Sequence, residues 1–252
     1  MTSPFDLTGK SAIVTGSTRG IGRAIAEGLI SAGARVLISS ESFADTRQVA
    51  SELAMPGICT DVADPDALGR LVDFARAELG AIDIVVCNAG ITGNAGPFAQ
   101  IDMNDFDRVM TVNLRSQVML ANLALPSVAE RGGGSCILLS SIAGLRGNGR
   151  INAYALAKAG VAQLARNLAV EWGPRNVRVN AISPGFIATD LSRNLMEIEE
   201  FMARRMALTP LRRPGLPEEI AGAAVFLASQ AGAFVTGHNL VVDGGTTITD
   251  GS

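Results

Sequence analysis

Short apolar runs rich in Val and Ile alternate along the chain with longer segments whose apolar residues recur with the period of a helix. The short runs predict strands at residues 11–16, 35–39, 57–61, 82–90, 135–141, 177–183 and 239–245. Strands that alternate with helices are typical of βα units and of a parallel sheet. The pattern therefore predicts an α/β fold with a doubly wound parallel sheet of about seven strands.

Local signals for helix ends agree with this pattern. Asp64 is placed to cap a helix whose first residue is Pro65, and Gly80 supplies a left-handed stop. Pro217 is followed by two acidic residues, which the positive end of a helix dipole favours. Residues 151–172 have helical period without an internal proline. Each of these segments is predicted to be a helix.

No linker rich in Pro, Gly or Ser divides the 252 residues, so we expect a single domain over residues 1–252. One segment, at about residues 190–206, lacks a clear period. It is expected to form a short helical insertion that acts as a lid over a substrate cleft.

Composition narrows the class of protein. Hydrophobic residues make up 48% of the chain and charged residues 18%, without low-complexity blocks, which excludes a disordered or solenoid protein. The net charge of −3 gives no reason to expect a nucleic-acid partner. The chain also lacks a signal-like N-terminus and an apolar run long enough to span a bilayer. We expect a soluble cytoplasmic protein without a membrane partner.

The cysteines and the histidine argue against metal chemistry. Cys59, Cys87 and Cys136 are widely separated and lie within or beside apolar runs, so we expect buried free thiols. His238 is the only histidine, which excludes a His-rich zinc site. No metal is expected.

A glycine-rich turn follows the first predicted strand and precedes an amphipathic helix. Its glycines, Gly16, Gly20 and Gly22, permit a tight turn and let the backbone approach a phosphate. The helix that follows offers unpaired N–H groups and the positive end of its dipole. This position in a βα unit predicts a site for the pyrophosphate of a dinucleotide.

Tyr154 is the only tyrosine in the chain, and Lys158, one of two lysines, follows it by four residues. On a helix this spacing places both side chains on one face. An ammonium about 4 Å from a phenolate, at an effective dielectric near 20, contributes about 4 kcal/mol. That energy corresponds to lowering the pKa of the phenol by about three units, as proton transfer near neutral pH requires. The same spacing also occurs in ordinary surface pairs.

Further motifs appear in order along the chain, with "CNAG" at residues 87–90, "MTVNL" at 110–114, "SSIAG" at 140–144, "YALAK" at 154–158 and "SPGFIATD" at 183–190. Together with TGxxxGxG in the first turn, they resemble the short-chain dehydrogenase/reductase family. The resemblance implies a single-domain Rossmann-type fold and an NAD(P)(H)-dependent oxidoreductase. Cys87 stands where the family commonly has Asn, and we expect it to alter packing without abolishing cofactor binding.

The resemblance implies four catalytic residues. Tyr154 is expected to be the general acid/base, and Lys158 to lower its pKa and bind the nicotinamide ribose. Ser141, thirteen residues before the tyrosine, is expected to hold the substrate oxygen, in preference to its neighbour Ser140. Asn113 is expected to distort its helix and hold a water that completes a proton relay.

The same resemblance implies a cofactor site at the carboxyl edge of the sheet. Its expected residues are Gly16, Thr18, Arg19, Gly20, Ile21, Gly22, Ser40, Asp61, Val62, Asn88, Ala89, Gly90, Tyr154, Lys158, Pro184, Gly185, Ile187 and Thr189. Ser40 and Arg19 favour NADP(H), whereas the carboxylate of Glu41 opposes a 2′-phosphate. The signals conflict and slightly favour NADP(H) over NAD(H).

The expected substrate is a small carbonyl compound or alcohol. Its predicted contacts are Ser141, Leu145, Asn148, Ile151, Tyr154, Phe186, Met196 and Met202. These mostly apolar residues indicate a hydrophobic ketone or secondary alcohol, while the nearby Arg146 and Arg150 are compatible with an acid. The sequence does not choose between the two.

Two other functions remain open. "GNGRINAYALAKAG" and "PGFIATDL" resemble 3-oxoacyl-(acyl-carrier-protein) reductases, which would need a basic docking surface near the cleft, with Arg131 and Arg175 as candidates. A nucleotide-binding protein that has lost catalysis is the more remote alternative, because all four catalytic residues are present. The resemblance also implies a homotetramer.

Overall fold

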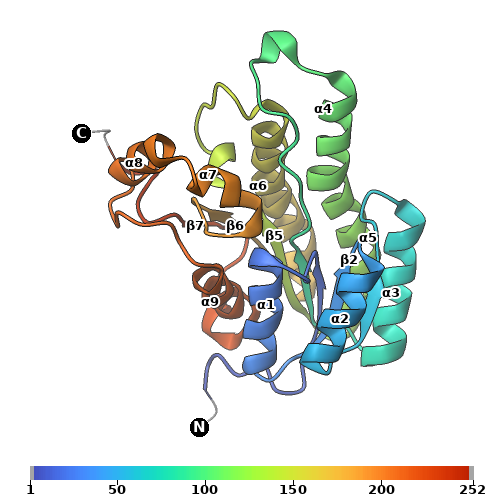
Figure 1. Ribbon diagram of the computed structural model, residues 1–252. Helices are drawn as coiled ribbons and strands as arrows, with labels where there is room; N and C mark the ends of the chain where they lie inside the picture. The colour runs from blue at the N-terminus through green and yellow to red at the C-terminus, as the bar shows by residue number, and fades with distance from the viewer. Residues whose placement is uncertain (1–2, 250–252) are drawn as a thin grey trace.

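The computed structural model describes residues 3–249, and residues 1–2 and 250–252 of the predicted domain lie outside them. Seven parallel strands form one sheet in the order β3-β2-β1-β4-β5-β6-β7 (Figure 1). Their bounds are β1 Ser11–Thr15, β2 Arg35–Ser40, β3 Gly57–Cys59, β4 Ile84–Cys87, β5 Gly134–Leu139, β6 Val177–Pro184 and β7 Asn239–Val242. All seven predicted strands are confirmed.

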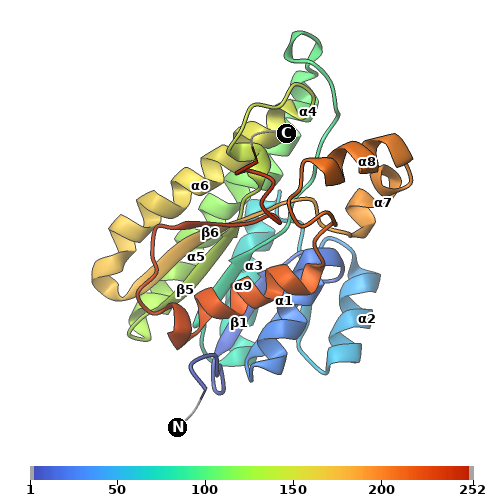
Figure 2. The same ribbon diagram turned by 90° about the vertical axis from the view of Figure 1, so that its left-hand side faces the viewer.

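Helices cover both faces of this sheet (Figures 1 and 2). One face packs against α1 (Gly20–Ser31), α2 (Phe43–Leu53) and α9 (Pro217–Ala228), and in both views α1 and α9 lie side by side. The other face packs against α3 (Pro65–Leu79), α5 (Ser116–Glu130) and α6 (Asn152–Trp172). Two apolar cores, one on each side of the sheet, result from this arrangement, as a doubly wound fold requires.

The predicted helix ends are found in the structure. Asp64 caps α3 by accepting a hydrogen bond from the backbone N–H of Asp66 at 2.9 Å, and Gly80 ends the helix at a φ of 73°. Pro217 is the first residue of α9, whose first turn contains two glutamates. Local capping chemistry thus sets these boundaries without help from distant contacts.

The order of the sheet reverses between β1 and β4, which are neighbours although β2 and β3 separate them in the chain. Val14 of β1 pairs with Val86 of β4, so both strands end at the same edge. In open α/β sheets, ligands bind in the crevice at the carboxyl ends of the strands where the order reverses. The glycine turn after β1 and the "CNAG" segment after β4 lie at this crevice.

The segment predicted as a lid is helical. It contains a short 3-10 turn and two helices, α7 (Arg193–Met196) and α8 (Glu199–Ala207), which project from the carboxyl edge of the sheet (Figures 1 and 2). Leu191, Leu195 and Ile198 are exposed on it. Exposed apolar side chains on a helical insertion are typical of a segment that packs on a ligand or on another chain.

Burial is as predicted for two cysteines and not for the third. Cys87 and Cys136 are buried in the central strands, whereas Cys59 is exposed, so its predicted burial is wrong. The reason is its position in β3, a short strand at the edge of the sheet, which is covered on fewer sides than a central strand. Within residues 3–249 no group of His, Cys, Asp and Glu is arranged to hold a metal ion. No helix in that range is long and apolar enough to cross a membrane.

Candidate active site

The glycine turn after β1 fits a pyrophosphate. Gly16 and Gly20 have φ values of 63° and 53°, and a β-carbon on Gly22 would collide with the carbonyl oxygen of Gly16. The helix that follows begins at Gly20 with no side-chain cap and no acidic residue in its first turn. Its first N–H groups therefore face the crevice without a side-chain acceptor, which suits an anion.

Asn88 shapes this turn from the neighbouring strand. Its side-chain amide donates hydrogen bonds to the carbonyl oxygens of Thr15 at 2.9 Å and Gly16 at 3.1 Å. Its backbone N–H donates to the Thr15 hydroxyl at 3.0 Å. Asn88, predicted as a cofactor residue, thus has its amide committed to the backbone of the glycine turn, and the segment through Gly90 forms the adjoining wall.

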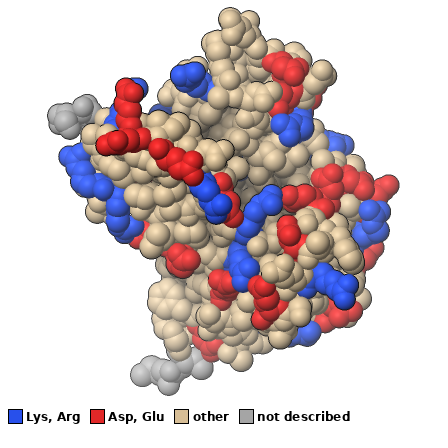
Figure 3. Space-filling model, in the orientation of Figure 1, with Lys and Arg blue, Asp and Glu red and all other residues tan. Residues whose placement is uncertain are grey.

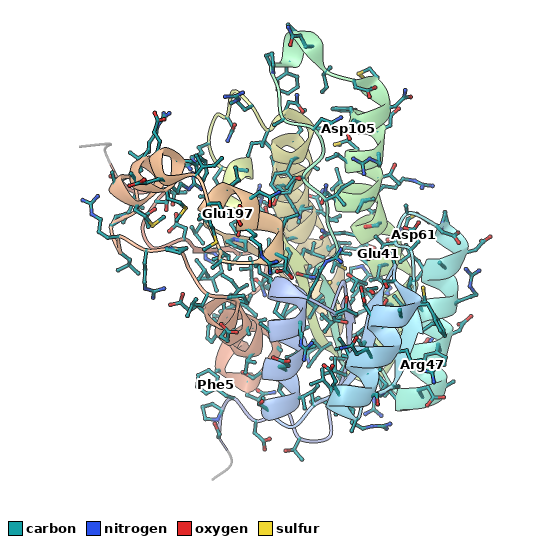
Figure 4. All side chains as sticks on the ribbon, in the orientation of Figure 1. Phe5, Glu41, Arg47, Asp61, Asp105 and Glu197 are labelled. Atoms are coloured by element: carbon teal, nitrogen blue, oxygen red, sulfur yellow. The ribbon has the colours of Figure 1, made fainter. Side chains whose placement is uncertain are left out.

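The expected adenosine end of the site contains an ion pair that the sequence did not reveal. Arg19 Nη2 lies 3.0 Å from the Glu41 carboxylate, and both side chains are exposed. Ser40 is buried, and its hydroxyl lies 3.0 Å from the Thr46 hydroxyl in α2. Figure 4 shows Glu41 near Asp61 at the ends of β2 and β3. Arg19 and Glu41, whose charges favour opposite cofactors, therefore form an ion pair with each other.

The segment after β6 crosses the crevice toward the glycine turn. The backbone N–H of Gly185 donates to Val242 at 2.9 Å, and Ile187 forms a bridge with Gly215. The methyl group of Thr189 lies against Gly20, where a β-carbon would approach it to 3.4 Å. The other expected cofactor residues also lie on the segments that end at this crevice: Thr18, Ile21, Val62, Ala89 and Pro184.

Three of the predicted catalytic side chains come together beside this crevice. Ser141 directly follows the end of β5, and Tyr154 lies in the first turn of α6. The Ser141 hydroxyl lies beside the phenol of Tyr154 and lowers its pKa. The ammonium of Lys158 lies 5.4 Å from the centre of the tyrosine ring. The predicted geometry of serine, tyrosine and lysine is therefore present.

The two neighbouring serines are used differently. The Ser140 hydroxyl is buried and donates to the backbone carbonyl of Lys158 at 2.7 Å, so it holds α6 against the end of β5. The short turn after Ser141 also packs on α6, where a β-carbon on Gly144 would collide with the backbone of Lys158 and Ala159. This close approach of two backbones sets the distance between Ser141 and Tyr154.

Burial determines the protonation behaviour of the site. It raises the pKa of Tyr154, and the hydrogen bond from Ser141 lowers this pKa by less. Burial also lowers the pKa of Lys158 to about 8. The Lys158 ammonium donates to the Leu139 carbonyl at 2.7 Å and lies 5.4 Å from the centre of the Tyr154 ring, so the expectation that its charge lowers the pKa of Tyr154 stays a prediction.

Asn113 lies in a π-helical turn, Thr111–Arg115, so the expected distortion of its helix is present. Its side-chain oxygen accepts from the backbone N–H of Ile91 at 3.0 Å, and its amide nitrogen donates to the Ile91 carbonyl at 2.7 Å. Within the part of the chain that the structure describes, no direct hydrogen bond joins Asn113 to Lys158. Asn113 therefore clamps the segment that follows the "CNAG" motif.

Figure 3 shows a hollow between the lobe of α7 and α8 and the lobe that carries α4 (Met103–Met110). The predicted substrate residues come from the segments after β5 and β6, from the start of α6 and from α7 and α8. Leu145 and Met196 are exposed, and Phe186 meets Phe201 of α8 edge to face at 5.6 Å. The Asn148 side chain instead accepts hydrogen bonds from the backbone N–H groups of residues 150 and 151, so it shapes its own turn. The remaining predicted contacts, Ile151 and Met202, are partly buried.

Arg205 was not singled out by sequence reasoning, although its guanidinium stacks on the ring of Phe186 at 5.6 Å. It lies in the segment without a clear period, where the only sequence signal is a pair of arginines between methionines. Arg205 therefore adds a positive charge beside Phe186, which is one of the predicted substrate contacts.

Arg131 and Arg175, expected near the cleft, lie at the opposite edge of the sheet. Arg131 lines a polar cavity of about 260 Å³ with Lys10 and Asp83, and Arg175 stacks on Trp172 at 4.8 Å. Trp172 ends the helix that Tyr154 begins, about 27 Å away at 1.5 Å per residue. Arg131 and Arg175, the candidates for a basic docking surface, therefore do not lie beside the cleft, because both precede the amino ends of strands.

Among the known proteins similar to this chain, three relatives match it over nearly its full length. A 2-dehydro-3-deoxy-D-gluconate 5-dehydrogenase of Formosa agariphila is 37% identical and covers 98% of this chain and 96% of its own. A 7alpha-hydroxysteroid dehydrogenase of Escherichia coli K12 is 39% identical, over 95% and 94%. A 3-oxoacyl-[acyl-carrier-protein] reductase of Aquifex aeolicus is 37% identical, over 95% and 98%.

Solved structures agree with these relatives. A putative gluconate dehydrogenase from Agrobacterium tumefaciens superposes with a TM-score of 0.94 at 35% identity, covering 98% of this chain and 100% of its own. A gluconate 5-dehydrogenase from Burkholderia cenocepacia, solved with NADP and tartrate, gives 0.92 at 34% identity, over 98% of both chains. The family model described as enoyl-(acyl carrier protein) reductase matches residues 16–247. The chain therefore belongs to the short-chain dehydrogenase/reductase family of nicotinamide-dependent oxidoreductases that act on CH–OH groups.

Proposed function

We propose that the enzyme interconverts a carbonyl compound and an alcohol with Tyr154 as general acid and base. The observation that carries this proposal is the position of Ser141 and Tyr154 beside the crevice, where the Ser141 hydroxyl lowers the pKa of the phenol and the Lys158 ammonium lies over the same ring. The nicotinamide, when bound, supplies or accepts the hydride. The protein then has to position the substrate oxygen and move one proton, and a serine hydroxyl with a phenol suits both tasks.

In the direction of reduction, the phenol of Tyr154 donates its proton to the substrate oxygen, and Ser141 holds that oxygen by a second hydrogen bond. The raised pKa of Tyr154 supports this direction at neutral pH, because the residue stays protonated. Oxidation needs the phenolate as base, so it gains from alkaline pH and from positive charge near the ring. Lys158 and the oxidised nicotinamide are the two sources of that charge.

Lys158 and Asn113 are proposed to relay the proton between Tyr154 and solvent. With a pKa of about 8, the Lys158 ammonium gives up a proton more readily than an exposed lysine does. The side-chain oxygen of Gln117 is buried without a hydrogen-bond partner within residues 3–249, and its amide nitrogen donates to the Asn113 carbonyl at 3.0 Å. This polar group beside Asn113 supports the proposal that an ordered water there links Lys158 to solvent.

Replacing Tyr154 by Phe tests the proposed mechanism. The substitution keeps the ring and removes the hydroxyl, so kcat for ketone reduction should fall by a factor of about 10² to 10⁴. The dissociation constant of the cofactor, measured by calorimetry, should change little because the proposed loss is a proton donor. Ser141→Ala is the companion variant and should also lower kcat. Unchanged turnover in Tyr154→Phe would contradict the assignment.

For the cofactor we propose NADP(H) as the preferred form, with NAD(H) also accepted. The exposed ion pair between Arg19 and Glu41 is worth at most about 1 kcal/mol, so Arg19 is readily drawn away from its partner. A hydrogen-bonded pair of arginine and phosphate is stronger than this exposed pair. Steady-state kinetics with both cofactors test the preference.

Reduction of acyl-carrier substrates is the second candidate, and the 37% identical reductase of A. aeolicus favours it. Arg131 and Arg175 give it no support, because they lie at the far edge of the sheet. Turnover of a 3-oxoacyl group on the carrier protein, compared with the same group on a short thioester, separates the two functions. A carrier-linked substrate that reacts no better than the free thioester would argue against this candidate.

We further propose a homotetramer, as the family resemblance implies. Phe234, which precedes β7, is fully exposed, and Val170 of α6 is 81% exposed. Large apolar side chains left uncovered on one chain are typical of surfaces that a second copy covers. Light scattering on the eluted protein gives the number of chains, and Phe234→Ser should lower it.

A further inference from the structure

Arg205 on α8 is held in an unusual setting. Its guanidinium is half-buried over the Phe186 ring at 5.6 Å, and its Nε is shielded from solvent without a hydrogen-bond partner among residues 3–249. A buried N–H of a charged group without an acceptor costs free energy comparable to a lost hydrogen bond or more. The side chain is thus positioned by packing and leaves donors unused.

A second arginine, in the loop that follows Ser141, lies close enough for its charge to act on Arg205. Arg146 is half-buried, and its positive charge lowers the pKa of Arg205 further, after the larger effect of burial. Neither guanidinium has a carboxylate within 4.0 Å among the residues described. Two like charges thus share one region of the wall without a direct ion pair.

One acidic group, Asp243, acts on Arg205 without forming a direct ion pair with it. Asp243 attracts Arg205 at longer range, but its two carboxylate oxygens accept hydrogen bonds from the backbone N–H groups of Gly245 at 2.8 Å and Thr247 at 2.7 Å. Arg19, also near the crevice, is paired directly with Glu41. Arg146 and Arg205 have no such direct partner among the residues described.

We propose that Arg146 and Arg205 together bind a carboxylate of the substrate, so that the enzyme acts on an oxo acid or the corresponding hydroxy acid. This inference rests on the proposed function of Ser141 and Tyr154. An arginine fork matches a carboxylate in two parallel hydrogen bonds, and partial burial strengthens the attraction. Arg146 follows Ser141 by five residues, within the same segment between β5 and α6.

The two residues also come from different parts of the wall. Arg146 belongs to the loop between β5 and α6, whereas Arg205 belongs to the helix that projects over the carboxyl edge of the sheet. A carboxylate held by both would connect the α7–α8 segment to the loop that carries Ser141. Acid binding is thus expected to order that segment as well as to orient the substrate.

Binding to the complex of the enzyme with NADP⁺ tests this directly, because a ketone does not react with the oxidised cofactor. The probes are levulinate and 4-oxocyclohexanecarboxylate, each paired with its uncharged methyl ester and measured by calorimetry. For at least one pair, the acid should bind at least tenfold more tightly than the ester. Arg205→Met and Arg146→Met should each remove that preference, and Arg205→Lys should keep part of it. Arg204→Met, an exposed neighbour on the same helix, is the matched control and should bind as the original protein does.

Esters that bind as well as their acids, acids that do not bind, or acid binding that survives both arginine substitutions would each overturn the proposal. Thermal melting of every variant separates lost binding from lost folding, and Arg205→Lys keeps the test valid if Arg205→Met unfolds. Turnover is scored separately with Tyr154→Phe. Acid binding that needs the arginines, together with turnover that does not need Tyr154, would refute the proposed function alone. Acid binding that does not need the arginines, together with turnover that needs Tyr154, would refute only the carboxylate site.

Discussion

The ammonium of Lys158 donates a 2.7 Å hydrogen bond to the backbone carbonyl of Leu139, the last residue of β5. Because Lys158 is buried in α6, this bond ties the helix of Tyr154 to the strand that precedes Ser141. It also places a titratable group in a position where its charge is costly. The lysine therefore has a structural effect that is measurable apart from catalysis.

The stability of the protein should depend on pH through Lys158. Its pKa is about 8 in the folded protein and 10.5 in a reference state, so between these values the unfolded chain holds a proton that the folded chain lacks. Stability from this group therefore rises with pH across that window, by about 3 kcal/mol in total. Urea unfolding at several pH values measures the free energy of unfolding of the original protein and of Lys158→Met. The difference between the two should shift in favour of the original protein from pH 7 to about 10.5. Parallel curves for the two proteins would contradict this.

Gly22→Ala should damage both the fold and cofactor binding. The added carbon would collide with the Gly16 carbonyl and the Asn88 amide, which the turn holds in place. We expect a loss of about 1–3 kcal/mol and a weaker cofactor complex. Gly69→Ala in α3 is the control, because nothing lies within 4 Å of the added carbon, and it should gain about 0.5–1 kcal/mol. Thermal melting and cofactor titration give both quantities, and equal behaviour of the two variants would refute the close contact.

The Arg19–Glu41 pair should control the choice of cofactor. Arg19→Met should weaken NADP⁺ binding by a factor of about 10 to 100, the effect of one charged hydrogen bond, while NAD⁺ binding changes little. Glu41→Gln should strengthen NADP⁺ binding, because it removes a carboxylate that competes for Arg19 and repels the phosphate. Equilibrium titration of each variant with both cofactors measures these shifts. Equal losses for NAD⁺ and NADP⁺ in Arg19→Met would show that the arginine does not discriminate.

Asn113→Ala should destabilise the wall that follows β4. The substitution leaves the buried N–H and carbonyl of Ile91 without their partners, at an expected cost of about 2–4 kcal/mol. Turnover should fall with it, since the proposed relay and the wall both depend on this residue. Asn104→Ala, at an exposed position in α4, should stay within about 0.5 kcal/mol. Chemical unfolding compares the two, and similar stabilities would argue against a clamping role for Asn113.

The parts of the site that depend on local spacing could be predicted from the sequence. Tyr154 and Lys158 share a helix face because of the helical period, and Ser141 follows a strand end that a short apolar run marks. The glycine turn needs only its position between a strand and a helix. The exposure of Cys59 could not be predicted in this way, because it depends on which strand lies at the edge of the sheet.

Contacts between side chains that are far apart in the sequence could not be predicted from the spacing of residues. Arg19 and Glu41 are 22 residues apart and meet only because β1 and β2 end together. Arg205 meets Phe186 because α8 folds back toward the end of β6. The raised pKa of Tyr154 comes first from burial, which the spacing of residues in the sequence does not give.

The contact of Gly144 with the backbone of α6 has a consequence for how this enzyme can change over time. Because main chains meet there, the separation of Ser141 from Tyr154 does not depend on the side chains that surround the hollow. Substitutions in residues 145–151 and in the α7–α8 segment are then expected to change substrate contacts more than proton transfer. New substrates can be acquired by exchanging the outer wall, while the reacting core is inherited unchanged.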